Sequence, residues 1–218
     1  MAEPELFFIV GPNAAGKSSF IRTRINELDG CEIIMTDVYK GRSKEIFAHA
    51  LSLKKNIVLE TVFNDSSFAS LADDAKSAGY KTSLIVLFLD SIQHSIDRVA
   101  FRTLEQNGLS ISGENIRINF NESFKNTAQY FFYFDRSDFI YTGITGVNTP
   151  IMGFNKSMLS YYNANELQYP QKFAEFSFHD DRLKQDAYSI ITTNASFQNV
   201  ADKNELEKTQ RTRPRLKL

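Results

Sequence analysis

Residues 11–19 read GPNAAGKSS, and they constrain the fold of this chain more than any other stretch. They fit the phosphate-binding loop (P-loop) pattern of a glycine, any four residues, Gly-Lys and then Ser or Thr. The two glycines let the backbone turn so that successive N–H groups point into one anion-sized hollow. The members of the predicted nucleotide-binding loop are Gly11, Pro12, Asn13, Ala14, Ala15, Gly16, Lys17, Ser18 and Ser19. Lys17 is expected to place its charge against the terminal phosphates, and the Ser18 hydroxyl to bind Mg²⁺.

The residues on either side of this loop favour a real phosphate site over a chance match. The apolar run Leu6–Val10 has the length of a buried strand, and residues 17–27 have the pattern of a helix. Strand, loop and helix is the order that the chemistry needs, because the partial positive charge of a helix N-terminus adds to the loop. We therefore expect ATP with Mg²⁺ to bind here.

The segments that follow alternate between strand and helix patterns. Strands are expected over 32–35, 56–59, 82–89 and 139–141, and helices over 43–55, 66–78, 91–106 and 114–132. This alternation implies parallel strands joined by right-handed crossovers. The predicted fold class is α/β, a parallel sheet of the P-loop kinase type flanked by helices, with a less regular C-terminal extension.

Three units are predicted along the chain. Residues 1–145 form the P-loop core, and residues 146–207 form an extension that packs on the core as a hairpin and one or two helices. Residues 208–218 form a basic tail, expected to be disordered, with five cations and no acid: Lys208, Arg211, Arg213, Arg215 and Lys217. Without these five, the chain holds 20 basic and 26 acidic residues, a net charge of −6. This balance disfavours a nucleic-acid-binding surface.

Other bulk features point to the cytoplasm. The longest apolar run, Leu84–Leu89, is far too short to span a bilayer, so no membrane partner is expected. The acidic start MAEPE does not resemble a signal peptide. The single cysteine, Cys31, suits a reducing compartment.

Acidic residues follow three of the predicted strands. In open parallel sheets, ligands gather at the carboxyl ends of the strands. Asp37 and Glu60 follow the second and third strands, and either suits a kinase, which needs an acid to orient or deprotonate the acceptor hydroxyl. Asp90 follows the fourth strand, and we expect it to cap the next helix, with a role through Mg²⁺-bound water as the alternative. Arg98 and Arg102, one helical turn apart, suit the mobile arginines that neutralise a phosphoryl group in transfer.

Two other classes of P-loop protein fit less well. A GTPase usually carries an Asn-Lys-x-Asp guanine-binding string, and the nearest string here, at 155–158, lacks the aspartate. Transporter-type ATPases share the Gly-Pro-Asn opening, but their Ser-Gly-Gly signature is absent from this sequence.

Four stretches in order resemble the zeta toxins of bacterial toxin–antitoxin systems. They are GPNAAGKSS at 11–19, IIMTD at 33–37, NIVLET at 56–61, and GYKTSLIVLFLDS leading into SIDRVAFR at 79–102. The resemblance runs from about residue 6 to residue 137. Zeta toxins are kinases that phosphorylate a sugar hydroxyl of UDP-N-acetylglucosamine.

The resemblance implies a role for each matching residue. Lys17 binds phosphate, Asp37 is the general base, Glu60 with the adjoining Thr61 holds the acceptor, and Arg102 belongs to a lid over the phosphates. An antitoxin protein is the implied partner.

The lid region departs from the family pattern. Many relatives carry a Gly-Gly-His segment and an arginine-rich stretch, where this chain reads NGLSISGEN and IRINFNES. Arg117 is the one arginine in the second stretch, so the candidate lid arginines are Arg98, Arg102 and Arg117. Two alternatives therefore stay open beside a sugar-nucleotide kinase. One is a polynucleotide-end or other nucleotide kinase, and the other is a non-catalytic nucleotide-binding module.

Overall fold

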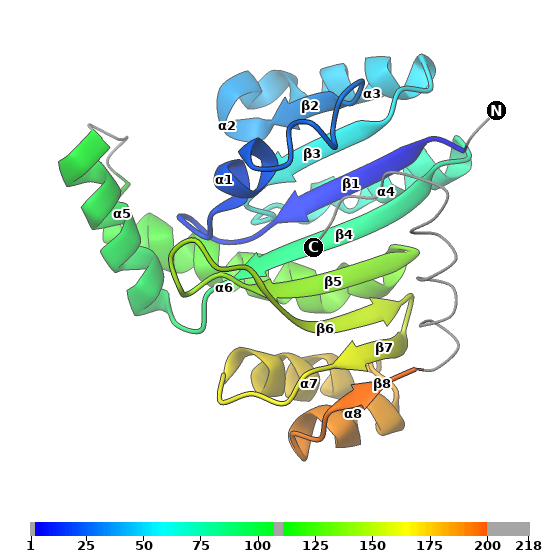
Figure 1. Ribbon diagram of the computed structural model, residues 1–218. Helices are drawn as coiled ribbons and strands as arrows, with labels where there is room; N and C mark the ends of the chain where they lie inside the picture. The colour runs from blue at the N-terminus through cyan, green and yellow to red at the C-terminus, as the bar shows by residue number, and fades with distance from the viewer. Residues whose placement is uncertain (1–2, 107–110, 200–218) are drawn as a thin grey trace.

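One sheet of eight strands runs through the molecule in the order β2-β3-β1-β4-β5-β6-β7-β8 (Figure 1). The computed structural model describes residues 3–106 and 111–199. Five strands pair in parallel and the last three antiparallel. The strands are β1 (Glu5–Val10), β2 (Glu32–Met35), β3 (Ile57–Thr61), β4 (Lys81–Phe88), β5 (Arg136–Tyr141), β6 (Thr149–Asn155), β7 (Met158–Tyr162) and β8 (Phe197–Gln198).

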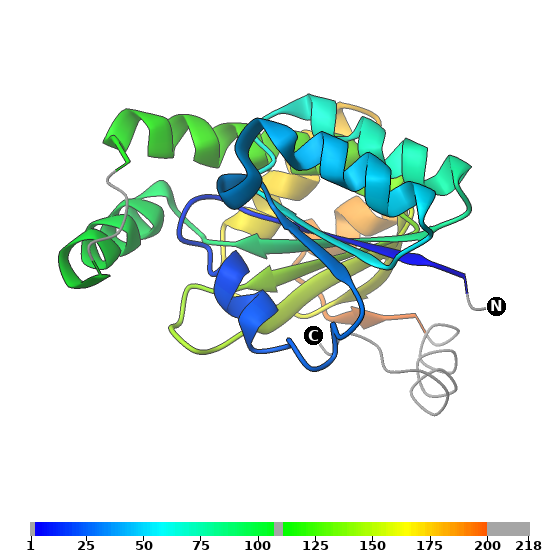
Figure 2. The same ribbon diagram turned by 90° about the horizontal axis from the view of Figure 1, so that it is seen from above.

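Helices cover the two faces of the sheet unequally (Figure 2). The larger core lies between the sheet and α3, α4, α6, α7 and α8, whereas α1 packs on the other face. The α-helices are α1 (Lys17–Arg22), α2 (Thr36–Tyr39), α3 (Ser43–Ser52), α4 (Ser70–Ser77), α5 (Ile92–Gln106), α6 (Gly113–Tyr130), α7 (Tyr169–His179) and α8 (Gln185–Thr192). The 3-10 helices are η1 (Lys40–Arg42), η2 (Ser66–Phe68) and η3 (Phe131–Tyr133).

The central strands owe their position to apolar side chains on both faces. In β1, Phe8 faces the larger core and Ile9 the smaller one, and both are fully buried. Strand β4 divides in the same way, with Val86 on the larger side and Leu87 on the smaller. Burial of one such side chain contributes about 1.5–3 kcal/mol, so these strands must lie inside the sheet.

The parallel α/β core is confirmed, and the C-terminal part is more regular than expected. Strands β6 and β7 form an antiparallel hairpin that extends the sheet beyond β5. Helices α7 and α8 pack against the face of the sheet that carries the larger core. The boundary predicted at residue 145 falls between β5 and β6, which are neighbours in this sheet. The predicted tail at 208–218 and the end of the extension at 200–207 lie outside the described residues.

The prediction that Asp90 caps the following helix, α5, is wrong, because Asp90 binds the N-terminus of α7 instead. Its Oδ1 accepts hydrogen bonds from the backbone N–H groups of Gln168 and Tyr169, at 2.8 Å each, and so it serves the N-terminus of α7. Ser91 Oγ accepts from the N–H of His94 instead, at the start of α5. The first N–H groups of any helix lack partners within the helix, and the carboxyl end of β4 brings Asp90 to those of α7.

Helix α5 stands beyond the carboxyl ends of β1 and β4 (Figure 1). It packs along α6, which returns to the sheet. Residues 107–110, within the predicted lid, lie outside the described residues. Among the described residues, no helix is both long enough and apolar enough to cross a membrane.

Candidate active site

The P-loop turns sharply between β1 and α1. Gly11 has a φ of 151°, and a Cβ at this position would collide with the carbonyl oxygen of Leu87 in β4. Gly16, with a φ of 88°, begins α1 in the left-handed conformation. Both positions therefore require glycine, the first because of close approach and the second because of its backbone angle. Ser18 and Ser19 are exposed in the first turn of α1.

Lys17 and Glu60 form a buried ion pair beneath this loop. Lys17 Nζ lies 3.6 Å from Glu60 Oε1, and it also donates to the carbonyl oxygens of Gly11 (2.9 Å) and Pro12 (3.1 Å). Burial lowers the pKa of Lys17, and the neighbouring Glu60 charge opposes that shift. Burial likewise raises the pKa of Glu60 against the pull of Lys17. Glu60 Oε2 is buried without a hydrogen-bond partner among the described residues.

Asp37 lies near enough to this pair for its charge to act on both groups, but it faces solvent. It stands in the first turn of α2, directly after β2, and its side chain is exposed. Its charge contributes to raising the pKa of both Lys17 and Glu60, so its carboxylate lies close to both groups. The carboxyl ends of β2 and β3 thus bring together the two acids that sequence analysis singled out. An exposed carboxylate beside a phosphate loop is placed to meet an incoming hydroxyl group.

Arg98 holds the backbone of the P-loop from α5. Its guanidinium donates to the carbonyl oxygens of Ala14 (3.4 Å) and Thr142 (2.7 Å). Thr142 Oγ1 in turn donates to the carbonyl oxygen of Ala15 (2.9 Å), and Ser95 Oγ donates to that of Asn13 (2.7 Å). These bonds give Arg98 a supporting position behind the loop, rather than a free position over the phosphates.

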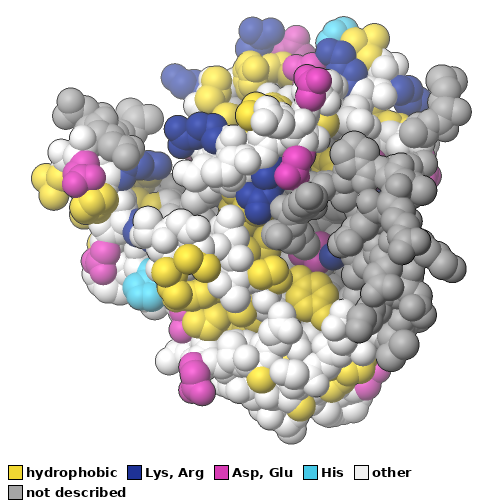
Figure 3. Space-filling model, viewed as in Figure 1, with side chains coloured by type: hydrophobic (Ala, Val, Ile, Leu, Met, Phe, Trp, Pro, Cys, Tyr) yellow, Lys and Arg dark blue, Asp and Glu magenta, His cyan; other side chains and the backbone are white. Residues whose placement is uncertain are grey.

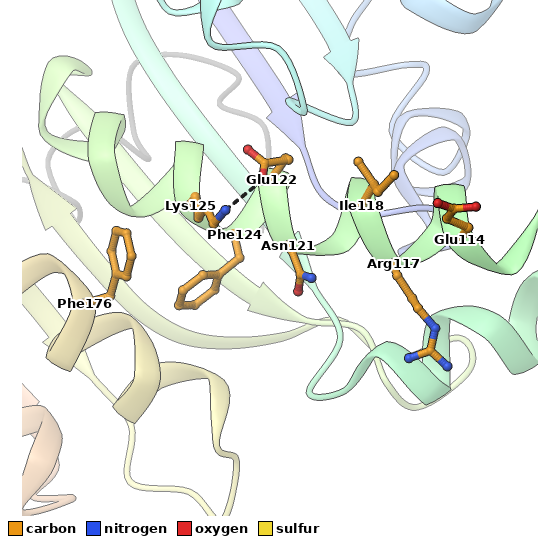
Figure 4. Close-up of a pocket in the computed structure, with 8 residues that line it drawn as sticks. All are labelled: Glu114, Arg117, Ile118, Asn121, Glu122, Phe124, Lys125 and Phe176. Atoms are coloured by element: carbon orange, nitrogen blue, oxygen red, sulfur yellow. Dashed lines mark hydrogen bonds and ion pairs between the residues drawn. The ribbon is translucent and has the colours of Figure 1, made fainter.

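The other two candidate lid arginines lie in different surroundings. Arg102 Nε is buried without a hydrogen-bond partner among the described residues, and the charge of Arg102 contributes to lowering the pKa of Lys17. Arg102 therefore lies close to the P-loop. Arg117 is exposed and lines a pocket of about 400 Å³ formed by residues of α6 and α7 (Figure 4). None of the residues lining this pocket belongs to the P-loop or to the loops after β2 and β3.

The remaining predicted acceptor residue, Thr61, is buried at the end of β3. Its Oγ1 accepts a hydrogen bond from the N–H of Phe63 at 3.2 Å, so it shapes the backbone just after Glu60. Sequence analysis did not single out Asn64 or Asn119, although both lie close by. Asn119 donates to Asn13 Oδ1 of the P-loop at 2.8 Å and accepts from Asn64 Nδ2 at 2.7 Å. The signal in the sequence was a polar residue beside the apolar stripe of α6.

Among the described residues, no group of three or more His, Cys, Asp or Glu could hold a metal by itself. Mg²⁺ keeps several waters and commonly uses one or two protein oxygens together with substrate phosphates. The exposed Ser18 hydroxyl fits a metal ion that arrives with the nucleotide.

Comparison with known proteins gives one family match and several similar folds. Residues 42–142 match the model of the zeta toxin family. This segment includes Glu60 and the three candidate lid arginines, and it begins after the P-loop and Asp37. A comparison with curated protein sequences gives no significant match.

Two solved structures share the fold. One, from the PezAT chromosomal toxin–antitoxin system of the human pathogen Streptococcus pneumoniae, has a TM-score of 0.55 at 12% identity and covers 97% of this chain and 86% of that one. The other, AvrRxo1-ORF1:-ORF2 with ATP, has a TM-score of 0.55 at 16% identity and covers 81% and 64%. This chain therefore matches just under two thirds of the second protein's length. The family match over residues 42–142 and the shared fold agree with the resemblance found in the sequence: this chain is similar to the zeta toxins over its central part.

Proposed function

We propose that this protein is an ATP-dependent kinase that transfers the γ-phosphate to a hydroxyl of a sugar nucleotide such as UDP-N-acetylglucosamine. The observation that carries the proposal is the buried Lys17–Glu60 pair beneath the P-loop, with the exposed carboxylate of Asp37 beside it. A phosphate-binding cation and two acids at one rim are what a transfer to an alcohol requires. The match of residues 42–142 to the zeta toxin family model supports the same reaction.

Each group has a role that follows from its surroundings. Lys17 exchanges its bonds to the loop carbonyls for bonds to the terminal phosphates. Glu60 Oε2 is a buried acceptor without a partner among the described residues, so it accepts a hydrogen bond from the sugar nucleotide. Asp37 orients the attacking hydroxyl and takes its proton late in the transfer, as the new O–P bond forms and the bond to ADP breaks. Arg102 stabilises the charge on the phosphoryl group in transfer.

The nucleotide partner is ATP with Mg²⁺, bound at residues 11–19. Ser18 holds the metal, which when bound neutralises charge on the β- and γ-phosphates. A protein with the same fold has a solved structure described with ATP, which supports this choice of nucleotide.

An antitoxin is the proposed protein partner, and the cytoplasm the proposed compartment. The similar fold from a toxin–antitoxin system supports this partner. Two large apolar side chains of α5, Phe101 and Leu104, are 60% and 84% exposed. Figure 3 shows hydrophobic side chains on the part of the surface that α5 forms, which is suitable for a protein contact.

A non-catalytic nucleotide-binding module is the second candidate, and the lid residues favour it. Arg98 donates hydrogen bonds to backbone carbonyls, and Arg117 lines a separate pocket. Of the three candidates this leaves Arg102, whose Nε has no hydrogen-bond partner among the described residues and whose charge acts on Lys17. Phosphoryl transfer generally needs such cations, so a module with too few of them binds ATP without turnover.

Transfer of labelled phosphate from ATP to a panel of acceptors tests the proposal. The panel contains UDP-sugars, nucleotides and oligonucleotides, each with and without Mg²⁺. We expect labelling of a UDP-sugar and none of the oligonucleotides. Labelling of an oligonucleotide would instead identify a polynucleotide-end kinase. ATP binding without transfer to any acceptor, together with normal growth of cells that overexpress the protein, would identify the non-catalytic module.

A further inference from the structure

Helix α6 presents a row of polar side chains to the active site. Asn119, Ser123 and Asn126 recur at spacings of four and three residues, which places them on one face of the helix. Ser123 and Asn126 are buried and Asn119 is half-buried. Buried polar side chains generally have hydrogen-bond partners. The partners of these two asparagines belong to the loops that form the candidate active site.

Asn126 holds the segment at the carboxyl end of β3, here called the acceptor loop and comprising residues 60–66, the first two of which are the last residues of the strand. Its Nδ2 donates to the carbonyl oxygen of Phe63 at 2.9 Å. Phe63 has a φ of 60°, a left-handed angle that a residue with a bulky side chain seldom adopts. The bond from α6 therefore stabilises an unusual turn immediately beyond Glu60 and Thr61.

Asn119, two helical turns before Asn126, binds both loops at once. Its Oδ1 accepts from Asn64 Nδ2 of the acceptor loop at 2.7 Å. Its Nδ2 donates to Asn13 Oδ1 of the P-loop at 2.8 Å. One amide group thus connects the loop that carries Glu60 with the loop that carries Lys17, although residue 119 lies 55 positions from one partner and 106 from the other.

Other side chains already bind the backbone of the P-loop, so Asn119 is not needed for that purpose alone. Ser95 binds the carbonyl oxygen of Asn13, and Arg98 binds that of Ala14, both from α5. What Asn119 adds is a link between side chains of the two loops. In-line transfer depends on the position of the acceptor relative to the γ-phosphate, and a displacement of 1 Å lowers a rate by about 10²-fold.

We propose that Asn119 is a positioning residue that couples the P-loop to the acceptor loop, so that the two substrates are held in a fixed relation. The inference rests on the proposed kinase function for its catalytic consequence, but the link itself consists of hydrogen bonds within the protein. Asn119 acts through Asn13 and Asn64.

Hydrogen–deuterium exchange of the nucleotide-free protein tests the link directly. Asn119→Leu removes both hydrogen bonds at similar volume. We expect faster exchange in peptides that cover residues 12–16 and residues 62–66 together, by about threefold to tenfold, which corresponds to the loss of about one hydrogen bond. The matched control is Asn121→Leu, an exposed position on the same helix, which should leave both peptides unchanged. Circular dichroism and thermal unfolding confirm that each variant is folded.

Kinetics with ATP and UDP-N-acetylglucosamine then separate positioning from simple support. Asn119→Leu should lower kcat about tenfold and leave the Kd for ATP within about twofold, because nucleotide contacts are retained. Asn64→Ala should have a similar effect, and the double variant should be no worse than either single variant, because all three break one chain of bonds. If Asn119→Leu leaves exchange in either loop unchanged, or if the kinetic effects of the two substitutions add, the coupling proposal is overturned. If the wild type transfers no phosphate, the kinase proposal fails, while the exchange result still decides the link.

Discussion

Lys17 Nζ lies 3.6 Å from Glu60 Oε1, and the two side chains are 7% and 4% exposed. The same ammonium group donates to two carbonyl oxygens of the P-loop. In the structure the loop therefore binds its own lysine, at the place where the terminal phosphates are expected. In the proposed kinase, Lys17 exchanges the two carbonyl bonds for bonds to phosphate, and the buried Glu60 Oε2, which has no partner among the described residues, accepts a hydrogen bond from the acceptor. This gives a physical reason for nucleotide and acceptor to bind as a pair.

Lys17→Ala tests the phosphate contact and the buried pair together. Charge-assisted hydrogen bonds contribute about 1.5–3 kcal/mol each, so ATP affinity should fall by about 10- to 100-fold in calorimetry. The substitution also leaves Glu60 buried without its cation, which should lower the free energy of unfolding by about 3 kcal/mol. Lys17→Ala combined with Glu60→Gln should recover part of that stability but none of the ATP affinity. Unchanged ATP binding in Lys17→Ala would remove the nucleotide site from this loop.

The raised pKa of Glu60 predicts a specific pH dependence of stability. Burial raises this pKa above its ordinary value of 4.5, so between 4.5 and the folded value the folded protein binds a proton that the unfolded chain has lost. The free energy of unfolding therefore falls as pH rises through that window. Glu60→Gln carries no titrating group here, so its profile should lack this fall. Denaturant unfolding at a series of pH values from 4 upward measures both curves. Parallel curves would show that the Glu60 carboxyl titrates normally.

Arg98 and Arg102 should respond differently to substitution, although one helical turn separates them. Arg102→Ala should lower kcat by about 10²-fold and leave ATP affinity nearly intact, because its Nε has no partner among the described residues and its charge acts near Lys17. Arg98→Ala should weaken ATP binding and lower the melting temperature, because it removes bonds to the loop backbone. Phosphate transfer, calorimetry and thermal unfolding on both variants make the comparison. Equal effects of the two substitutions on all three measurements would contradict this division of roles.

Much of the core could be predicted because its signals are local. The apolar runs that became β1, β3 and β4 are buried on both faces, and strict burial leaves a continuous hydrophobic pattern in the sequence. Hairpin β6–β7 and its place in the sheet were predicted only vaguely, since an antiparallel extension depends on which edge strand it meets. The helix predicted over 17–27 ends earlier, at Arg22, where i to i+3 hydrogen bonds such as Ile25 N–H to Arg22 take over.

Site residues at the ends of strands could be predicted from the sequence, whereas those on the faces of helices were harder to predict. Asp37 and Glu60 follow parallel strands, and the sheet brings such ends together. The partner of Asp90 lies 78 and 79 residues further along the chain, a distance over which capping leaves no sequence pattern. Which arginine faces the loop depends on the rotation of α5 and α6. Asn119 was missed for the same reason, because its partners come from two distant loops.

Asp37→Asn is the substitution that most directly separates a kinase from a binding module. The side chain follows β2 in the first turn of α2, is exposed, and lies close enough to Lys17 and Glu60 to influence the pKa of each. Asparagine keeps its shape and hydrogen-bonding reach but cannot take a proton. ATP affinity should stay within a few-fold, while transfer to the acceptor should fall by about 10²–10⁴-fold. Removal of a negative charge also favours phosphate binding slightly, so any change in ATP affinity should be a gain.

Asp29→Asn is the matched control for this substitution. Asp29 is also exposed, and it lies in the turn that precedes β2. It should leave both ATP affinity and transfer unchanged, so that the loss in Asp37→Asn is assigned to the carboxylate and not to a change in net charge. Measurement of single-turnover transfer from labelled ATP isolates the chemical step from product release. Full single-turnover activity in Asp37→Asn would show that this carboxylate is not the base, and Glu60, the other acid beside Lys17, would then be the group to test.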